Sequence, residues 1–197
     1  MKVMTYDEAR SWCRGAEVEL TSDGDLRYPG QSEHKFFVLA PEEFRRIMAL
    51  TGTIVSFRGE AVFSGGLIWL RRWDIGTSRL ARVGWRVIED VRRAHGDSRS
   101  LEVAPAQLFR DDEISELHAF LMLIICFGWV AEFVPAASRD FFIHFKDNRQ
   151  LCFTAGSAAL LEELRVALSE WNPTRQDPMV KRLTELQRAR RRNRSAT

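Results

Sequence analysis

The spacing of apolar and polar residues predicts a chain of short strands and amphipathic helices. Alternation of apolar and polar residues, or a short apolar run, predicts strands at 16–21, 35–40, 64–73 and 100–103, with a hairpin pair over 53–63. Apolar residues that recur every three or four positions predict helices from Thr5 through Cys13, from Pro41 to Gly52, and from Thr77 or Ser78 to Gly96.

The least polar stretch, "HAFLMLIICFGWVAEF" at 118–133, predicts a central buried helix. Thirteen residues from Ala119 to Ala131 carry no charge, whereas a helix needs about 20 apolar residues to cross a bilayer. Acidic residues at 111–113 favour a helix start, and Gly128 suits the left-handed residue after a helix end. The helix is apolar nearly all round, which is typical of a helix enclosed by protein.

The remaining pattern predicts the fold class. Three strands over 129–134, 140–146 and 150–154 form a meander, and a last helix runs from Ser157 to Trp171 before Asn172-Pro173 stops it. Strands joined by short turns argue for an α+β fold, mainly antiparallel sheet with helices packed on one face.

Two segments of the predicted domain share an order of elements. Residues 5–51 and 113–171 both begin and end with a helix around strands, which suggests two α-β-β-α halves that share one sheet. We expect one compact domain over 1–172 and a tail over 173–197 that is partly helical or disordered.

Composition limits the chemistry. Hydrophobic residues make up 45% and charged residues 28%, as in an ordinary globular protein. Three scattered cysteines (Cys13, Cys126, Cys152) have no metal-ligand spacing, which predicts reduced thiols, no metal centre and no cofactor. Residues 1–12 contain no apolar signal core, so we expect a cytoplasmic protein without a transmembrane segment.

The net charge of +2 hides a basic tail. Residues 172–197 carry eight basic and two acidic side chains, a net +6 that leaves −4 for residues 1–171. This tail has three interpretations. It binds nucleic acid, it docks on an anionic surface, or it is a solvated extension without a partner. The candidate contact residues are Arg188, Arg190, Arg191, Arg192 and Arg194.

Two further groups of residues are candidates for a ligand site. Arginine beside tryptophan in "WLRRW" (Trp69, Arg71, Arg72, Trp73) can hold a phosphate or a base, although the same pattern is typical of arginines lying across packed tryptophans. His118 and His144 are candidate polar groups, and Cys126 or Cys152 can meet one of them as a Cys–His pair.

Other motifs are explained by local structure. Ser64 lacks the flanking glycines of a nucleophile elbow, and Ser157 before the last helix is an ordinary N-cap. No catalytic motif is complete, so the leading hypothesis is a non-enzymatic binding or regulatory module whose partner is unknown, with protein or a second copy as candidates. The first alternative is a small enzyme or small-molecule binder with a site assembled from scattered His, Arg and Cys residues. The second is nucleic-acid association through the tail.

A structure separates these hypotheses. A deep pocket that contains a histidine or cysteine with a shifted pKa favours the enzyme or small-molecule binder. A flat surface with an exposed apolar patch favours the interaction module.

Overall fold

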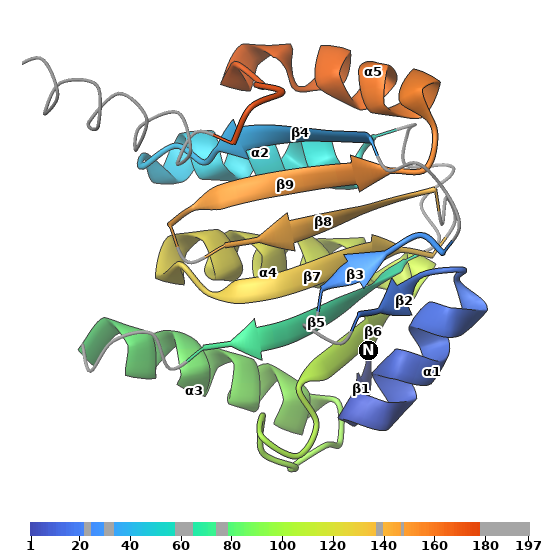
Figure 1. The fold of residues 1–197 in the computed structure, drawn as a ribbon. Helices are drawn as coiled ribbons and strands as arrows, with labels where there is room; N and C mark the ends of the chain where they lie inside the picture. The colour runs from blue at the N-terminus through green and yellow to red at the C-terminus, as the bar shows by residue number, and fades with distance from the viewer. Residues whose placement is uncertain are drawn as a thin grey trace, which may run out of the picture.

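The computed structural model describes residues 1–21, 25–29, 34–57, 65–73, 79–136, 140–146 and 148–177. Its centre is a seven-stranded sheet in the order β1-β6-β5-β7-β8-β9-β4, in which neighbouring strands pair antiparallel (Figure 1). The strands are β1 (Lys2–Met4), β4 (His34–Leu39), β5 (Gly66–Arg72), β6 (Ala106–Phe109), β7 (Val130–Pro135), β8 (Phe141–Phe145) and β9 (Gln150–Ala155). A separate ribbon pairs β2 (Glu19–Leu20) with β3 (Leu26–Arg27).

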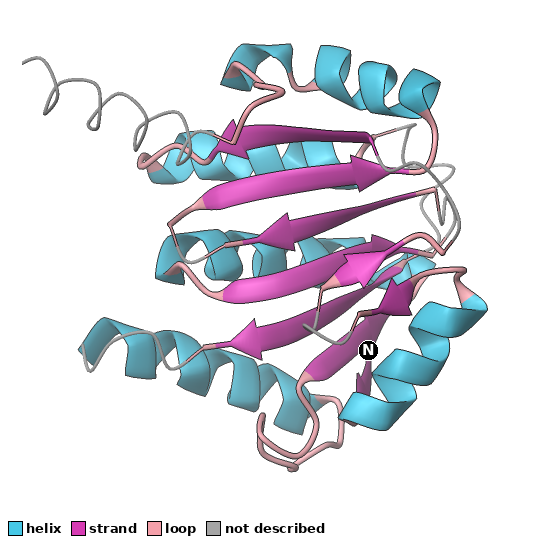
Figure 2. Cartoon of the chain, viewed as in Figure 1, coloured by secondary structure: helices cyan, strands magenta, loops and turns pink. Residues whose placement is uncertain are grey.

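Five helices accompany these strands in the described part of the chain, so the predicted α+β class is confirmed (Figure 2). They are α1 (Tyr6–Gly15), α2 (Phe44–Val55), α3 (Arg79–Ala94), α4 (Ile114–Phe127) and α5 (Ala158–Ala167). Short 3₁₀ turns precede α4 (Asp111–Glu113) and follow α5 (Ser169–Trp171).

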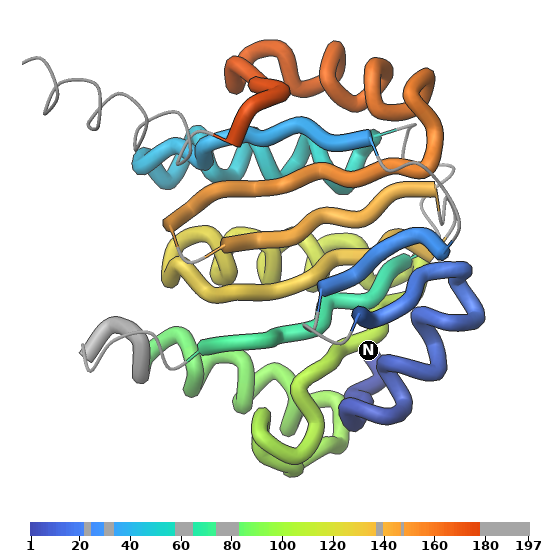
Figure 3. The backbone as a smooth tube through the Cα atoms, in the orientation of Figure 1, coloured from blue at the N-terminus to red at the C-terminus, as the bar shows by residue number. Residues whose placement is uncertain are grey.

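The sheet has two different faces. One face packs Phe36, Ile68, Phe133, Ile143 and Phe153 into the large core, to which α2, α3, α4 and α5 also contribute. The other face carries a smaller core beneath α1 and the ribbon. In the tube view α2 and α4 lie behind the sheet, and α1 and the ribbon lie in front of it, toward its β1 side (Figure 3). Four helices therefore contribute to the core on one face of the sheet, as expected. α1 differs, because it packs on the other face.

The central helix is where the sequence predicts it. α4 buries Leu117, Phe120, Leu121, Ile124 and Ile125. Gly128 follows the helix with φ 64°, the left-handed conformation that glycine adopts without steric cost.

Several boundaries were predicted wrongly. α2 continues through Gly52 to Val55, because Thr51, Ile54 and Val55 are buried in the core and tertiary packing outweighs their strand preference. Residues 53–55 are thus helical, and most of the predicted hairpin at 53–63 lies outside the described residues. Residues 101–103 form a turn, and the strand is β6, which follows that turn.

The two candidate halves differ in how they enter the sheet. Residues 113–171 supply three adjacent strands, β7, β8 and β9, whereas residues 5–51 supply only the edge strand β4 and place β2 and β3 in the ribbon. Their origin by duplication stays a prediction.

The C-terminal segment begins by pairing with the sheet edge. Asn172 takes a positive φ of 50° after the last 3₁₀ turn, and Thr174 then exchanges two backbone hydrogen bonds of 2.8 Å with Phe37 of β4. The predicted tail therefore contacts the sheet over its first residues. Its five candidate arginines, Arg188 to Arg194, lie outside the described residues, as does Ser64.

Candidate functional site: a polar pocket on the sheet

One row of side chains crosses the second face of the sheet. Strand register pairs Trp69 with Glu132, Glu132 with His144, His144 with Cys152, and Cys152 with Phe37. Partners in register on antiparallel strands point to the same face, with Cβ atoms about 5 Å apart. The sheet thereby brings a carboxylate, an imidazole and a thiol from three strands into adjacent positions.

Glu132 and His144 form the most polar contact of this row. Nδ1 of His144 lies 2.6 Å from Oε1 of Glu132, and the two side chains are 23% and 1% exposed, respectively. The other carboxylate oxygen, Oε2, is buried and has no hydrogen-bond partner among the described residues. Since Nδ1 faces Glu132, Nε2 on the opposite side of the ring is the nitrogen left for a ligand.

The pair holds a proton more tightly than its separate groups do. Burial raises the pKa of Glu132, against the hydrogen bond and charge of His144 and the charge of Arg71. Burial disfavours the imidazolium of His144, but the hydrogen bond and charge of Glu132, helped by Asp25, outweigh it and raise the pKa of His144. We therefore expect the pair to retain one proton above the pH at which an ordinary histidine loses it.

A cavity of about 220 Å³ lies over this pair. Its walls combine two aromatic rings, a hydroxyl and a thiol with cationic groups near the histidine. The lining residues are Asp25, Leu26, Lys35, Phe37, Glu132, Phe142, His144, Lys146, Cys152 and Thr154. Apolar walls with a few convergent polar groups are typical of small-molecule sites.

Charged groups of both signs lie around the cavity in the described part of the chain. Lys35 and Lys146 line it, with Asp25 on the ribbon side. Nζ of Lys146 lies 3.2 Å from Oδ2 of Asp177 and 5.4 Å from the centre of the Phe37 ring. One cation of the pocket, Lys146, thus already has a carboxylate partner, which comes from the C-terminal segment.

Cys152 lies in the cavity but is not activated as a nucleophile. Its Sγ is 3.9 Å from Oγ1 of Thr154. Burial raises the pKa of its thiol, and the hydrogen bond with Thr154 and the charges of Lys35 and Lys146 only partly oppose this effect, so the thiol stays protonated at neutral pH. The sequence hypothesis of a Cys–His pair is met in position by His144 and Cys152, but Cys126 is exposed on α4 and does not line the cavity.

The tryptophan–arginine candidates lie outside the cavity lining. Arg71 stands at a bulge of β5 and lies over the rings of Trp69, at 4.6 Å, and Tyr6, at 5.7 Å. Trp69 is buried, Arg72 is exposed, and Trp73 packs against the large core. The motif thus matches the interpretation in which arginine lies across packed aromatic rings. The charge of Arg71 also lowers the pKa of Glu132.

Of the two candidate histidines, only His144 lines the cavity. Nε2 of His118 contacts the Met48 carbonyl at 3.1 Å and joins α4 to α2. Sequence reasoning missed Lys35, Lys146 and above all Glu132. The sequence did contain a signal for Glu132, because this carboxylate lies within the apolar strand "WVAEFVP" and a buried charge needs a partner.

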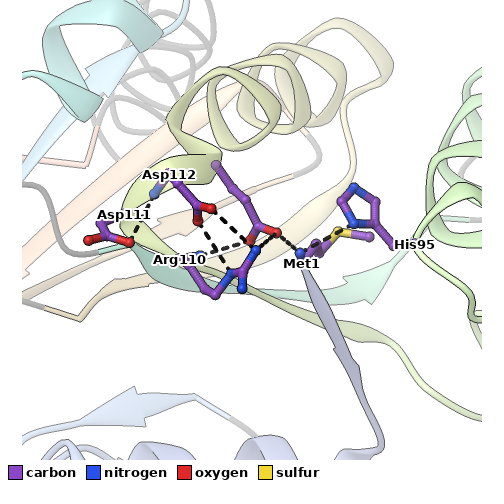
Figure 4. A network of polar contacts seen from close by, with 6 residues as sticks. Met1, His95, Arg110, Asp111 and Asp112 are labelled. Carbon is purple, nitrogen blue, oxygen red and sulfur yellow. Dashed lines mark hydrogen bonds and ion pairs between the residues drawn. The ribbon is translucent and has the colours of Figure 1, made fainter.

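A second polar cluster ties β1 to the start of α4 (Figure 4). The amino group of Met1 contacts the carboxylate of Glu113 and lies 3.4 Å from Nδ1 of His95. Glu113 also accepts hydrogen bonds from the backbone and guanidinium of Arg110, at 2.9 and 3.3 Å. This cluster fastens two elements and is not part of the cavity lining.

Other site types find no support in the described ranges. No group of three or more His, Cys, Asp and Glu residues there can hold a metal ion. No described helix has the length and apolar composition needed to span a membrane. Comparison of the chain with protein-family models, curated proteins and solved structures finds no match. Fold and site together define an antiparallel α+β protein. Its small pocket has polar and apolar walls and contains a pair formed by buried Glu132 and half-buried His144.

Proposed function

We propose that this protein is a binding module for a small organic carboxylate, held in the pocket by protonated His144. The observation that carries the proposal is the pair of buried Glu132 and half-buried His144 beneath a cavity that Lys35 and Lys146 also line. This combines the binding module expected from the sequence with its small-molecule alternative. Nucleophilic catalysis by Cys152 is not part of the proposal, because burial keeps its thiol protonated.

The chemistry of the pocket fits such a ligand in two parts. When His144 is protonated, Nδ1–H donates to Glu132 and Nε2–H is left to donate to an anion, and a bond of this kind is about twice as strong as a neutral one. Phe37 and Phe142 offer apolar surface for the body of the ligand. A carboxylate on an aromatic or aliphatic body satisfies both parts.

Protein partners remain a second proposal, supported by an exposed apolar pair on α2. Phe44 and Met48 lie one helical turn apart and are 60% and 45% exposed. A protein or a second copy of the chain is a candidate for this surface. Nucleic-acid contact through the tail stays a prediction, and a cytoplasmic location is supported by three free cysteines.

Calorimetric titration with benzoate, succinate and inorganic phosphate tests the proposal. We expect benzoate to bind the unmodified protein below pH 6.5, the ordinary pKa of histidine, and to bind about tenfold more weakly to the double variant E132Q/H144Q. The double variant avoids leaving a carboxylate buried alone.

His118→Gln is the matched control, because it removes a half-buried histidine outside the pocket. Its affinity for benzoate should equal that of the unmodified protein. The proposal is wrong if neither benzoate nor succinate binds, or if E132Q/H144Q binds benzoate as tightly as the control.

A further inference from the structure

The C-terminal segment 173–177 reaches the proposed pocket from the edge of the sheet. β4 is an edge strand of the sheet, and the two backbone hydrogen bonds between Phe37 and Thr174 cover part of that edge. Phe37 belongs to both features, since its backbone pairs with the segment and its ring lines the cavity. The segment is therefore joined to the pocket wall through Phe37.

Asp177 in this segment places its carboxylate against Lys146, one of the two lysines that line the pocket. Its Oδ2 lies 3.2 Å from Nζ of Lys146, and its Oδ1 accepts a hydrogen bond of 2.8 Å from Nε2 of Gln150. The Lys146 and Asp177 side chains are 32% and 23% exposed, so water reaches both. A carboxylate from the chain itself thus occupies one cationic end of the site proposed for a ligand carboxylate.

We infer that Asp177 competes with the ligand, so that occupancy of the pocket and docking of segment 173–177 on β4 oppose each other. The inference rests on the proposed function. Two carboxylates at Lys146 would repel each other, whereas exchange of one for the other leaves the local charge balance unchanged.

Release of Asp177 weakens the hold of the whole segment. Apart from its side-chain contacts, the segment pairs with β4 at a single residue, Thr174. Binding of the carboxylate therefore favours the undocked segment, and by linkage an undocked segment favours binding by the same factor. The edge of β4 is then open for pairing with another strand.

Two substitutions weaken docking in different ways. Asp177→Asn keeps the size of the side chain but removes the charge that faces Lys146. Thr174→Pro keeps the Asp177 side chain in the sequence but removes the N–H that donates to the Phe37 carbonyl, and so weakens the backbone pairing. Each variant should bind benzoate about fivefold or more tightly than the unmodified protein, the lower end of ordinary coupling between sites.

Glu170→Gln is the matched control, because it neutralises an exposed carboxylate just before the segment. Its benzoate affinity should be unchanged. A second readout is hydrogen exchange at the Phe37 amide, which donates to Thr174 in the docked state. Saturating benzoate should speed exchange at this amide in the unmodified protein.

The outcomes separate the inference from the function on which it rests. If benzoate binds the unmodified protein, Asp177→Asn and Thr174→Pro equally and leaves exchange at Phe37 unchanged, the competition is refuted and the binding function stands. If neither benzoate nor succinate binds any of these proteins, both fall. Tighter binding by both variants but not by Glu170→Gln supports the inference.

Discussion

Glu132 and His144 depend on each other at the scale of single residues. A carboxylate buried in a sheet loses its hydration and is tolerated only with a charged or hydrogen-bonded partner. His144 on the neighbouring strand is that partner, at 2.6 Å. The pair therefore stabilises the fold only while it keeps its shared proton.

The stability of the protein should fall as the pH rises above 6.5, the ordinary value for histidine. Both pKa values of the pair are raised in the folded state, so the folded protein binds more protons than the unfolded chain, and its free energy of unfolding decreases with pH. The charges of Asp25, Arg71 and Lys146 act on the pair. They change the pH at which stability is lost, but stability still falls as the pH rises.

Urea denaturation across neutral and mildly alkaline pH measures this dependence. The loss of stability should be smaller in E132Q/H144Q, which has no proton to lose at this position. An unmodified protein as stable above this range as below it would contradict the raised pKa values.

The residues of the site were only partly predictable from the sequence. His144 stood out as a histidine in an apolar strand, but its significance comes from Glu132, twelve positions earlier. Strand register sets this pairing, and a shift of one residue would send the side chains to opposite faces. Lys35 and Lys146 belong to the site for the same non-local reason.

Local signals predicted single elements better than pairings. α4 matched its prediction because its apolar run, acidic start and Gly128 act within the segment. β1, β3 and β6 are two to four residues long and were not predicted, since such strands exist only through their partners. α2 extends beyond Gly52, where the sequence predicted its end, because burial of Ile54 and Val55 favours continuing the helix.

The junction between β1 and α4 depends on Glu113. Glu113→Gln should lower the free energy of unfolding by about 1–3 kcal/mol, because its buried carboxylate meets the Met1 amino group and Arg110. Denaturant unfolding measures the change. Asp111→Asn is the control, since Asp111 is exposed and accepts one hydrogen bond from the next backbone amide. Equal stability of the two variants would contradict a fastening role for Glu113.

The asymmetry of the sheet explains where the pocket lies in the whole molecule. Four helices contribute to the large core on one face, whereas on the other face α1 and the ribbon share a smaller core. Leu26 of the ribbon and Asp25 just before it meet the β4, β7, β8 and β9 side chains at the cavity. The α+β class followed from the sequence, but the uneven covering of the two faces depends on how distant elements pack.

The most direct test of carboxylate binding is the pKa of the His144 imidazole, measured by NMR titration of its ring nitrogens with and without benzoate. An anion that binds the protonated ring must raise this pKa further. We predict a pKa above 6.5 without benzoate and a higher value with it. A pKa at or below 6.5 that benzoate leaves unchanged would contradict the role of His144 as the anchor of a carboxylate.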